Sequence, residues 1–173
     1  MTRLIIMRPK RRREGKTNYR ARFTMLKSNK PRLVVRKTNR YLIAQIIESK
    51  EAQDFVKVHV NSKELKKVGW EFSFKNIPAA YLTGLIIGKK ALEKGIKEAI
   101  LDIGIIDSTK GSRIYAVLKG AIDSGLNVKH SEEILPSIDR IQGRHIQKNS
   151  GDIIRKFEEI KNNIIKSKKV KES

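Results

Sequence analysis

The segment PRLVVRKTNRYLIAQIIES, residues 31–49, predicts two adjacent β-strands joined by a tight turn. Val and Ile are enriched in strands, and here they lie on both sides of the polar tripeptide at 38–40. An Asn within that tripeptide suits a hairpin. Apolar and polar residues then alternate over residues 55–60, which predicts a third strand. Three strands in sequence order predict an antiparallel meander.

A further strand region lies downstream of the meander. Residues 98–106, EAILDIGII, form a short apolar run, which is typical of a strand buried at the centre of a sheet. A polar loop at 107–112, a helix at 113–124 and a short edge strand at 125–128 follow, and this order predicts a βαβ unit. The predicted fold class is therefore α/β: a mixed sheet that combines the antiparallel meander with the βαβ unit and has helices packed on it.

The remaining segments are expected to be mainly helical. The central helix spans 77–94 with Pro78 in its first turn. Gly84 and Gly88 lie four residues apart on one face of it, where another backbone can approach closely. Other expected elements are a helix at 11–28, a short helix at 62–68, an extended aromatic segment at 70–74, and helices at 136–148 and 152–166. We expect three parts: a basic N-terminal arm and helix at 1–30, an α/β domain at 31–150, and a C-terminal helix with a lysine-rich tail at 151–173.

The composition restricts the classes of function. The 173 residues suffice for one ordinary domain with extensions, and the absence of cysteine excludes disulfides, thiolate metal sites and thiol nucleophiles. The longest weakly polar run, residues 77–88, is too short to cross a bilayer, and residues 4–7 are too few for the apolar core of a signal peptide. We therefore expect a cytoplasmic protein with no membrane partner and no small-molecule substrate.

Positive charge is concentrated in the first forty residues. The chain carries 39 Lys and Arg against 18 Asp and Glu, a formal net charge of +21. Residues 1–40 contain fifteen of these bases and one acid, Glu14, which leaves +14. Like charges repel one another in a folded protein, so this density is typical of a surface that binds a polyanion. Arginine suits phosphate oxygens because its guanidinium donates two parallel hydrogen bonds.

Candidate RNA contacts fall into four groups along the sequence. The N-terminal group is Arg8, Lys10, Arg11, Arg12, Arg13, Lys16, Thr17, Tyr19, Arg20 and Arg22. The hairpin group is Lys27, Ser28, Lys30, Arg32, Arg36, Lys37, Asn39 and Arg40. The loop group is Thr109, Lys110, Ser112 and Arg113, between a strand and a helix N-terminus that favours an anion. The last group is Arg140, Arg144 and His145, which we expect on one face of a helix together with Lys148.

Two of these groups carry predictions about which way side chains face. Alternation along strand 31–38 sends Arg32 and Arg36 to one face of the sheet and Leu33 and Val35 to the other. The arginine face is then a candidate platform for RNA. In the helix at 11–28, Tyr19 and Phe23 could stack on unpaired bases, but their helical spacing favours packing against the core.

Two other interpretations use different residues. Asp102, Asp107 and Asp123 suggest a metal-dependent nuclease, but two-metal hydrolysis needs acids that converge on two cations, and Asp102 within an apolar strand is better explained by pairing with a basic residue or buried backbone. No phosphate-binding G-x-x-x-x-G-K-[ST] loop is present, so a nucleotide site is not expected. A general RNA-binding protein has the same composition and stays open.

Several blocks of sequence, in order, resemble a known family. They are RRREGKTNY at 11–19, LKS at 26–28, KPRLVVRK at 30–37, GWE at 69–71, AAYLTGL at 79–85, LDIG at 101–104, GS at 111–112, GAIDSGL at 120–126 and His130. Together they resemble the archaeal and eukaryotic form of large-subunit ribosomal protein eighteen, the universal L18 family. The resemblance covers about residues 11–145, and it is the combination of blocks that makes it specific.

The resemblance implies a structural ribosomal protein with no catalytic residue, no cofactor and no metal. It also implies a ribonuclease-H-like layout and a position in the central protuberance of the large subunit. The implied partners are 5S rRNA, 23S rRNA and the neighbouring large-subunit ribosomal protein five, together with other proteins of the central protuberance.

Overall fold

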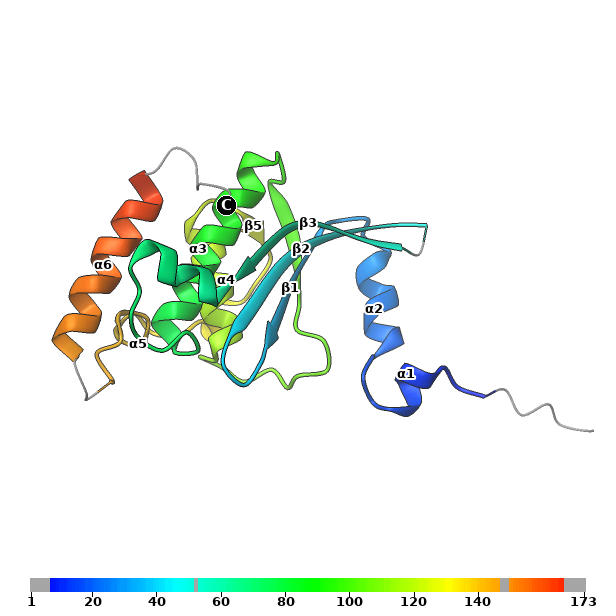
Figure 1. Ribbon diagram of the computed structural model, residues 1–173. Coiled ribbons are helices and arrows are strands. Elements are labelled where there is room, and N and C mark those ends of the chain that lie inside the picture. Colours follow the sequence, from blue (N-terminus) through cyan, green and yellow to red (C-terminus); the bar gives the residue numbers. More distant parts are fainter. Residues whose placement is uncertain (1–6, 52, 147–149, 167–173) are drawn as a thin grey trace, which may run out of the picture.

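The computed structural model describes residues 7–51, 53–146 and 150–166 (Figure 1). Its centre is a five-stranded mixed sheet in the order β3-β2-β1-β4-β5. The strands are β1 (Arg32–Lys37), β2 (Leu42–Lys50), β3 (Gln53–Asn61), β4 (Glu98–Asp102) and β5 (Asn127–Val128). β1, β2 and β3 pair antiparallel, whereas β4 pairs parallel with both β1 and β5. The predicted meander and βαβ unit are both confirmed.

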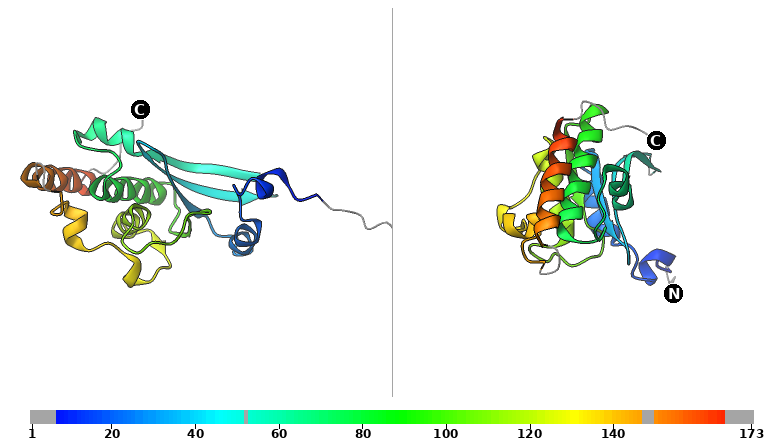
Figure 2. Two further views of the ribbon diagram at one scale, coloured as in Figure 1. Left: turned by 90° about the horizontal axis from the view of Figure 1, so that it is seen from below. Right: turned by 60° about the vertical axis from the view of Figure 1, so that its left-hand side comes forward.

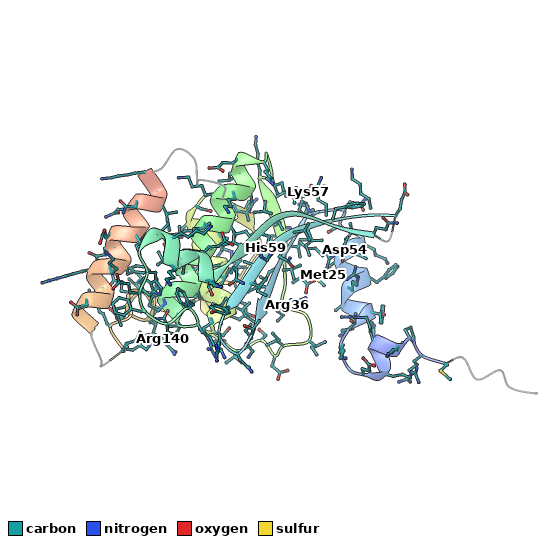
Figure 3. All side chains as sticks on the ribbon, viewed as in Figure 1. Met25, Arg36, Asp54, Lys57, His59 and Arg140 are labelled. Carbon is teal, nitrogen blue, oxygen red and sulfur yellow. The ribbon has the colours of Figure 1, made fainter. Side chains whose placement is uncertain are left out.

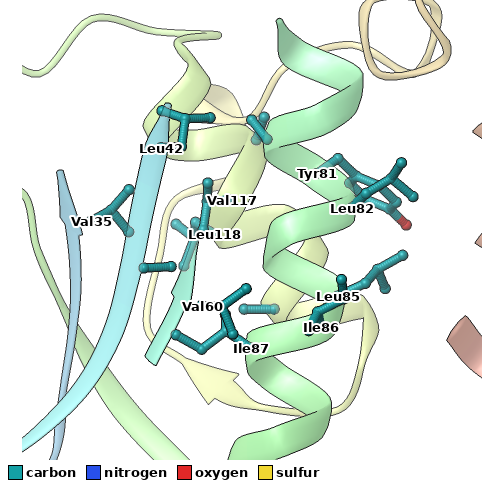
Figure 4. Close-up of a cluster of buried hydrophobic side chains, with 14 of the residues drawn as sticks. Val35, Leu42, Val60, Tyr81, Leu82, Leu85, Ile86, Ile87, Val117 and Leu118 are labelled. Carbon is teal, nitrogen blue, oxygen red and sulfur yellow. The ribbon is translucent and has the colours of Figure 1, made fainter. Parts of the chain in front are cut away.

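Helices cover one face of this sheet. The helices are α3 (Ile77–Glu93), α4 (Arg113–Asp123), α5 (Ile138–Gln142) and α6 (Ser150–Lys166), with short 3-10 turns η1 (Ser62–Val68) and η2 (Glu132–Ile134). Leu33 and Val35 of β1 are fully buried in the core that α3 and α4 share with the sheet. Figure 4 shows strand side chains such as Val60 lying between the sheet and these two helices. α6 lies beyond α3 as seen from the sheet, and its Phe157 belongs to the same core (Figures 1 and 2).

α3 and α4 touch backbone to backbone. A Cβ atom on Gly84 would lie 2.1 Å from the carbonyl oxygen of Val117, and one on Gly120 would lie 2.1 Å from the carbonyl oxygen of Tyr81. Both positions therefore require glycine, because real Cβ atoms do not come this close to a backbone oxygen. The close approach that the sequence predicts at Gly84 is confirmed.

Four predicted elements are wrong in length or type. The helix at 11–28 is two helices, α1 (Lys10–Arg13) and α2 (Tyr19–Leu26), because Gly15 adopts φ +63 and Asn18 caps a new helix. β4 ends at Asp102 rather than 106, since Gly104 turns the chain at φ +72. Residues 70–74 form turns rather than an extended segment, and the helix predicted at 136–148 spans only α5 before Gly143 at φ +84 ends it. Lys148 and the tail at 167–173 lie outside the described residues.

The aromatic residues in this turn segment still belong to the core. Trp70 is fully buried and its indole Nε1 donates a hydrogen bond to the carbonyl of Ser73 at 3.1 Å. Phe72 packs edge-on against Trp70, with 5.3 Å between ring centroids. Trp70 is thus part of the core, and Phe72 and Phe74 pack against it partly buried, although their backbone is irregular.

The β2–β3 hairpin extends past the core. A register shift between Ile46 and Ile47 marks the point where the pairing becomes irregular. Beyond it, Phe55 and Val56 of β3 are 47% and 50% exposed. Figure 2 shows this two-stranded ribbon running away from the helices toward α1 and α2. The N-terminal helices therefore lie at the end of the ribbon and not on the helical layer.

An ion-pair network lies on the sheet face opposite the helices. Arg32 is only 2% exposed, and its guanidinium donates to Asp102 Oδ2 at 2.8 Å and to Asp54 Oδ1 at 2.8 Å. Arg36 donates to Asp102 Oδ1 at 2.9 Å. Arg22 of α2 pairs with the other oxygen of Asp54 at 2.7 Å. These ion pairs thus link β4, β1, the β2–β3 hairpin and α2. The prediction that Asp102 pairs with basic residues is confirmed.

Gly84→Ala should destabilise the fold by about 1–3 kcal/mol or more, because the added methyl group meets the α4 backbone and forces the two helices apart. The matched control is Gly151→Ala, where a Cβ meets nothing within 4 Å, so the free energy of unfolding should stay the same or rise slightly. Urea denaturation of both variants measures this, and equal stabilities would contradict the close packing.

Asp102→Asn should cost about 3–5 kcal/mol of unfolding free energy, since it leaves the buried charge of Arg32 without its main partner. Asp139→Asn is the control, because Asp139 forms an exposed pair with Arg144 at 3.2 Å that contributes less than about 1 kcal/mol. A similar small loss in both variants would show that the network is not required for stability.

The pKa of Asp54 should make the attachment of α2 sensitive to acid. Partial burial acts to raise this pKa, but hydrogen bonds from Ser49, Arg22 and Arg32 together lower it below its usual 3.8. A lowered pKa stabilises the fold above pH 3.8, and this contribution is lost as the pH falls through the folded-state value. The stability difference between the protein and Asp54→Asn should therefore be constant near neutrality and shrink in acid. A pH series of urea midpoints measures it, and a constant difference would contradict the assignment.

Candidate nucleic-acid interface

The N-terminal helices present a continuous basic surface. α1 consists of four consecutive bases, Lys10 to Arg13, and neither α1 nor α2 contains a buried residue. Glu14, the acid in this segment, pairs with Lys16 at 2.8 Å. Arg11 donates from Nε to the hydroxyl of Thr17 at 2.9 Å, which holds the link between the two helices in place. The described residues of the N-terminal group, from Arg8 to Arg22, thus lie together at one end of the molecule (Figure 1).

α2 attaches to the β2–β3 hairpin through a helix face that the sequence pattern did not predict to be buried. Its partly buried side chains are Arg22, Met25 and Leu26, and Figure 3 places Met25 and Asp54 in the region between α2 and the sheet. Tyr19 is 39% exposed and Phe23 is 61% exposed, so the prediction that they pack against the core is wrong. The physical reason is the position of α2 at the ribbon, where no core is available to cover a second stripe.

The exposed aromatic rings sit among cations. The ammonium group of Lys27 lies 4.8 Å from the centroid of the Phe23 ring. Arg20 and Lys16 are exposed on the same short segment as Tyr19. This arrangement can contact both the phosphates and the bases of an RNA strand.

The hairpin group is divided between two ends of β1. Lys27, Ser28 and Lys30 lie at its start, where Lys30 pairs with Glu98 at 2.6 Å. Lys37, Asn39 and Arg40 lie exposed at its other end. Between them Arg32 is buried and Arg36 is held by Asp102, so the prediction of an open arginine platform on the sheet is wrong for Arg32. The predicted alternation itself is confirmed, but ion pairs bury Arg32 and engage Arg36, whose side chain stays 40% exposed.

Residues from three sequence groups line one pocket. The pocket has a volume of about 780 Å³, and it lies where the end of β1, the turns before α3 and the loop before α4 meet. Its lining includes Lys37 of the hairpin group; Thr109, Lys110, Ser112 and Arg113 of the loop group; and Arg140 and His145 of the last group. Arg144 does not line it, because it follows the end of α5 and pairs with Asp139.

Sequence reasoning missed one cation of this pocket. Lys75 lines it, donates from Nζ to the carbonyl of Asn39 at 3.0 Å, and accepts a hydrogen bond at its own carbonyl from Arg113. Its position next to Asn76, the N-cap of α3, was the available signal, since a base at a helix N-terminus is unfavourable unless an anion lies nearby.

Two of the three candidate catalytic acids, Asp102 and Asp123, are engaged by other side chains. Asp102 is held by two arginines, and Asp123 accepts hydrogen bonds from Tyr81 at 2.7 Å and from Lys119 at 3.0 Å. Burial and this bond to Asp123 raise the pKa of Tyr81 well above its usual value. Among the described residues, no three His, Asp or Glu side chains lie together in a way that could hold a metal ion. Over the same ranges, no helix is long and apolar enough to span a membrane.

Comparison with known proteins gives a consistent result. The family described as "Ribosomal large subunit proteins 60S L5, and 50S L18" matches residues 5–97 and 93–131. The large ribosomal subunit protein uL18 of Korarchaeum cryptofilum is 58% identical over 137 residues, which cover 79% of this chain and 70% of that protein. The uL18 of Caldivirga maquilingensis is 54% identical over 83% of this chain and 70% of its own length. That of Methanospirillum hungatei is 50% identical over 83% of this chain and 82% of its own length.

The matches span the N-terminal helices, the meander and the βαβ unit, and the identities stay at 50% or above over about four-fifths of the chain. The chain therefore belongs to the family of large ribosomal subunit proteins that comprises 60S L5 and 50S L18, as an archaeal-type uL18 protein.

Proposed function

We propose that this protein binds 5S rRNA and docks it onto 23S rRNA in the central protuberance of the large subunit. Its family makes it a structural, non-enzymatic protein of the large ribosomal subunit. The observation that carries the finer proposal is the N-terminal surface, on which α1 exposes its four bases, α2 exposes Arg20, and neither helix buries a residue. The neighbouring ribosomal protein five is the protein partner that we propose.

Phosphate neutralisation supplies most of the affinity in this proposal. The bases of α1 and α2 repel one another in the free protein, and an RNA backbone removes that repulsion while releasing its own condensed counterions. Three consecutive arginines, Arg11 to Arg13, point from different sides of a single turn of helix. They can therefore contact phosphates on both sides of a groove or bend rather than along one line.

Recognition beyond charge comes from the exposed rings. Tyr19 is 39% exposed and Phe23 is 61% exposed, whereas the ion pair that joins α2 to the β2–β3 hairpin is formed by Arg22 and Asp54. An unpaired base can stack on such a ring, and stacking favours looped or bulged RNA over a regular duplex. The exposed basic residues and the exposed rings together favour a folded RNA that has unpaired bases. This is the reason for proposing 5S rRNA as the ligand.

The two alternative functions are less consistent with the geometry. A ribonuclease-H-like nuclease needs free carboxylates, whereas Asp102 is 5% exposed and neutralised by two arginines. A general RNA-binding protein fits the charge as well as the proposal does, and only selectivity separates the two.

Replacing Arg11, Arg12 and Arg13 together with Gln should weaken binding to 5S rRNA strongly and flatten its salt dependence. If about six to ten phosphates are contacted, the unchanged protein should show a log-log slope of roughly −4 to −9, and removing three contacts reduces its magnitude by about two to three. Filter binding to 5S rRNA across a salt series measures both quantities.

The control variant replaces three exposed lysines away from this surface, Lys63, Lys66 and Lys129, with Gln. It removes the same charge and should leave affinity and slope nearly unchanged. Equal losses in both variants would show that only net charge matters. Equal affinity of the unchanged protein for tRNA and 5S rRNA would favour the general RNA-binding function instead.

A further inference from the structure

We propose that the pocket between the end of β1, the turns before α3 and the loop before α4 holds a single unstacked nucleotide of ribosomal RNA. Its base would lie against Phe72 and Ile106, and its phosphates would lie at Lys37, Lys75, Arg113 and Arg140. This inference rests on the proposed function, because it takes rRNA as the ligand, and it adds a second contact away from the N-terminal helices.

The pocket is large enough for a small ligand, and it lies away from the N-terminal helices, as a second binding site requires. Its volume of about 780 Å³ lies within the range of about 300–1,000 Å³ that is typical of small-molecule sites. Lys37 marks the C-terminal end of β1, whereas α2 attaches beside the start of that strand through Arg22 and Asp54. Arg140, labelled on α5 in Figure 3, lies on the side of the molecule away from α2.

The charge of the pocket favours an anion. Five Lys or Arg side chains line it against one acid, Asp107. One of the five, Lys110, forms an exposed pair with Glu133 at 3.1 Å. The other four, Lys37, Lys75, Arg113 and Arg140, come from four different parts of the chain. Because the fold brings separate cations together at one hollow, local sequence composition does not account for them.

Two long helices begin at the same hollow. Asn76, the N-cap of α3, and Ser112, the N-cap of α4, both line the pocket. The side chain of Ser112 makes no capping hydrogen bond, in contrast to that of Asn76, which accepts from Ala79 N. The positive ends of both helix dipoles therefore add to the potential of the four cations, which is favourable for phosphate.

The apolar wall distinguishes a nucleotide from a bare phosphate. Phe72 is partly buried, packs edge-on against Trp70 and lines the pocket with an aromatic ring. Ile106 packs against the core and also lines the pocket. A phosphate alone would leave this surface unused, whereas a base stacks on aromatic and apolar side chains. The combination of an apolar wall with a cationic rim favours a nucleotide.

The test measures how much of the affinity depends on a base. The full-length variant with Arg11, Arg12 and Arg13 replaced by Gln serves as the parent, since it reduces binding at the N-terminal surface. Its binding to a fluorescent eight-residue oligouridylate is compared with binding to an abasic oligonucleotide with the same number of phosphates. We expect about a tenfold preference for the oligouridylate, in keeping with the usual contribution of one stacked base.

Two changes in the pocket should affect this preference differently. Ile106→Ser should largely abolish it, whereas Ile105→Ser should not, because Ile105 is 57% exposed and does not line the pocket. Arg113→Gln should weaken binding of both oligonucleotides by a similar factor of about three to ten and leave their ratio unchanged. Urea midpoints check that each variant is folded, and Arg113→Gln tests the rim if Ile106→Ser is unstable.

Three outcomes would overturn the inference. Equal affinity for the two oligonucleotides would mean a phosphate contact without a base. An unchanged preference in Ile106→Ser would place the base elsewhere, at Tyr19 or Phe23. Stronger competition by octaglutamate than by oligouridylate would assign the pocket to an acidic protein segment. None of these results changes the preference for 5S rRNA over tRNA, so the failure of this inference and that of the proposed function are distinguishable.

Discussion

Asp102 connects β4 to β1 and, through Arg32 and Asp54, connects the central sheet to α2. It ends β4, receives hydrogen bonds from Arg32 and Arg36 of β1, and accepts another from the backbone N–H of Gly104 at 2.8 Å. Both of its oxygens are therefore satisfied in a position that is 5% exposed. A buried charge is costly unless it is paired and hydrogen-bonded, and here two arginines of β1 and one nearby backbone N–H meet this requirement.

The consequence of that pairing extends to the N-terminus. Arg32 is shared between Asp102 and Asp54, and Asp54 is shared between Arg32 and Arg22. The position of α2, and with it the proposed RNA surface, thus depends on a carboxylate that lies across the sheet. In a chain of net charge +21, these few acids matter because they decide which arginines are held inside and which stay available to a ligand.

The sequence predicted the sheet well because alternation is a local property. Leu33 and Val35 had to face one side and Arg32 and Arg36 the other, and the structure agrees. Alternation does not reveal whether the second face is open, and that depends on Asp102 and Asp54, which are 70 and 22 residues away from Arg32. The same limit applies to Tyr19 and Phe23, whose helical stripe gave no information on how far α2 lies from the core.

The pocket, unlike the alternation of the strands, could not be predicted from local sequence. Lys37, Arg113 and Arg140 each drew attention as basic residues, yet no local pattern indicated that they share one hollow. Both α3 and α4 begin at this pocket, and the two helices pack closely at Gly84, as the sequence predicted. The sequence thus indicated the helix packing but not the pocket at the helix N-termini.

The β2–β3 ribbon also has a mechanical consequence. Two strands without a helical layer behind them bend far more easily than the backed part of the sheet, and an isolated hairpin is only marginally stable. α2 is attached to this ribbon near Asp54, so bending of the strands can tilt α2 while its ion pair with Arg22 stays intact. The N-terminal end can therefore adjust its tilt by bending of the ribbon while the ion pairs keep it attached to the central sheet.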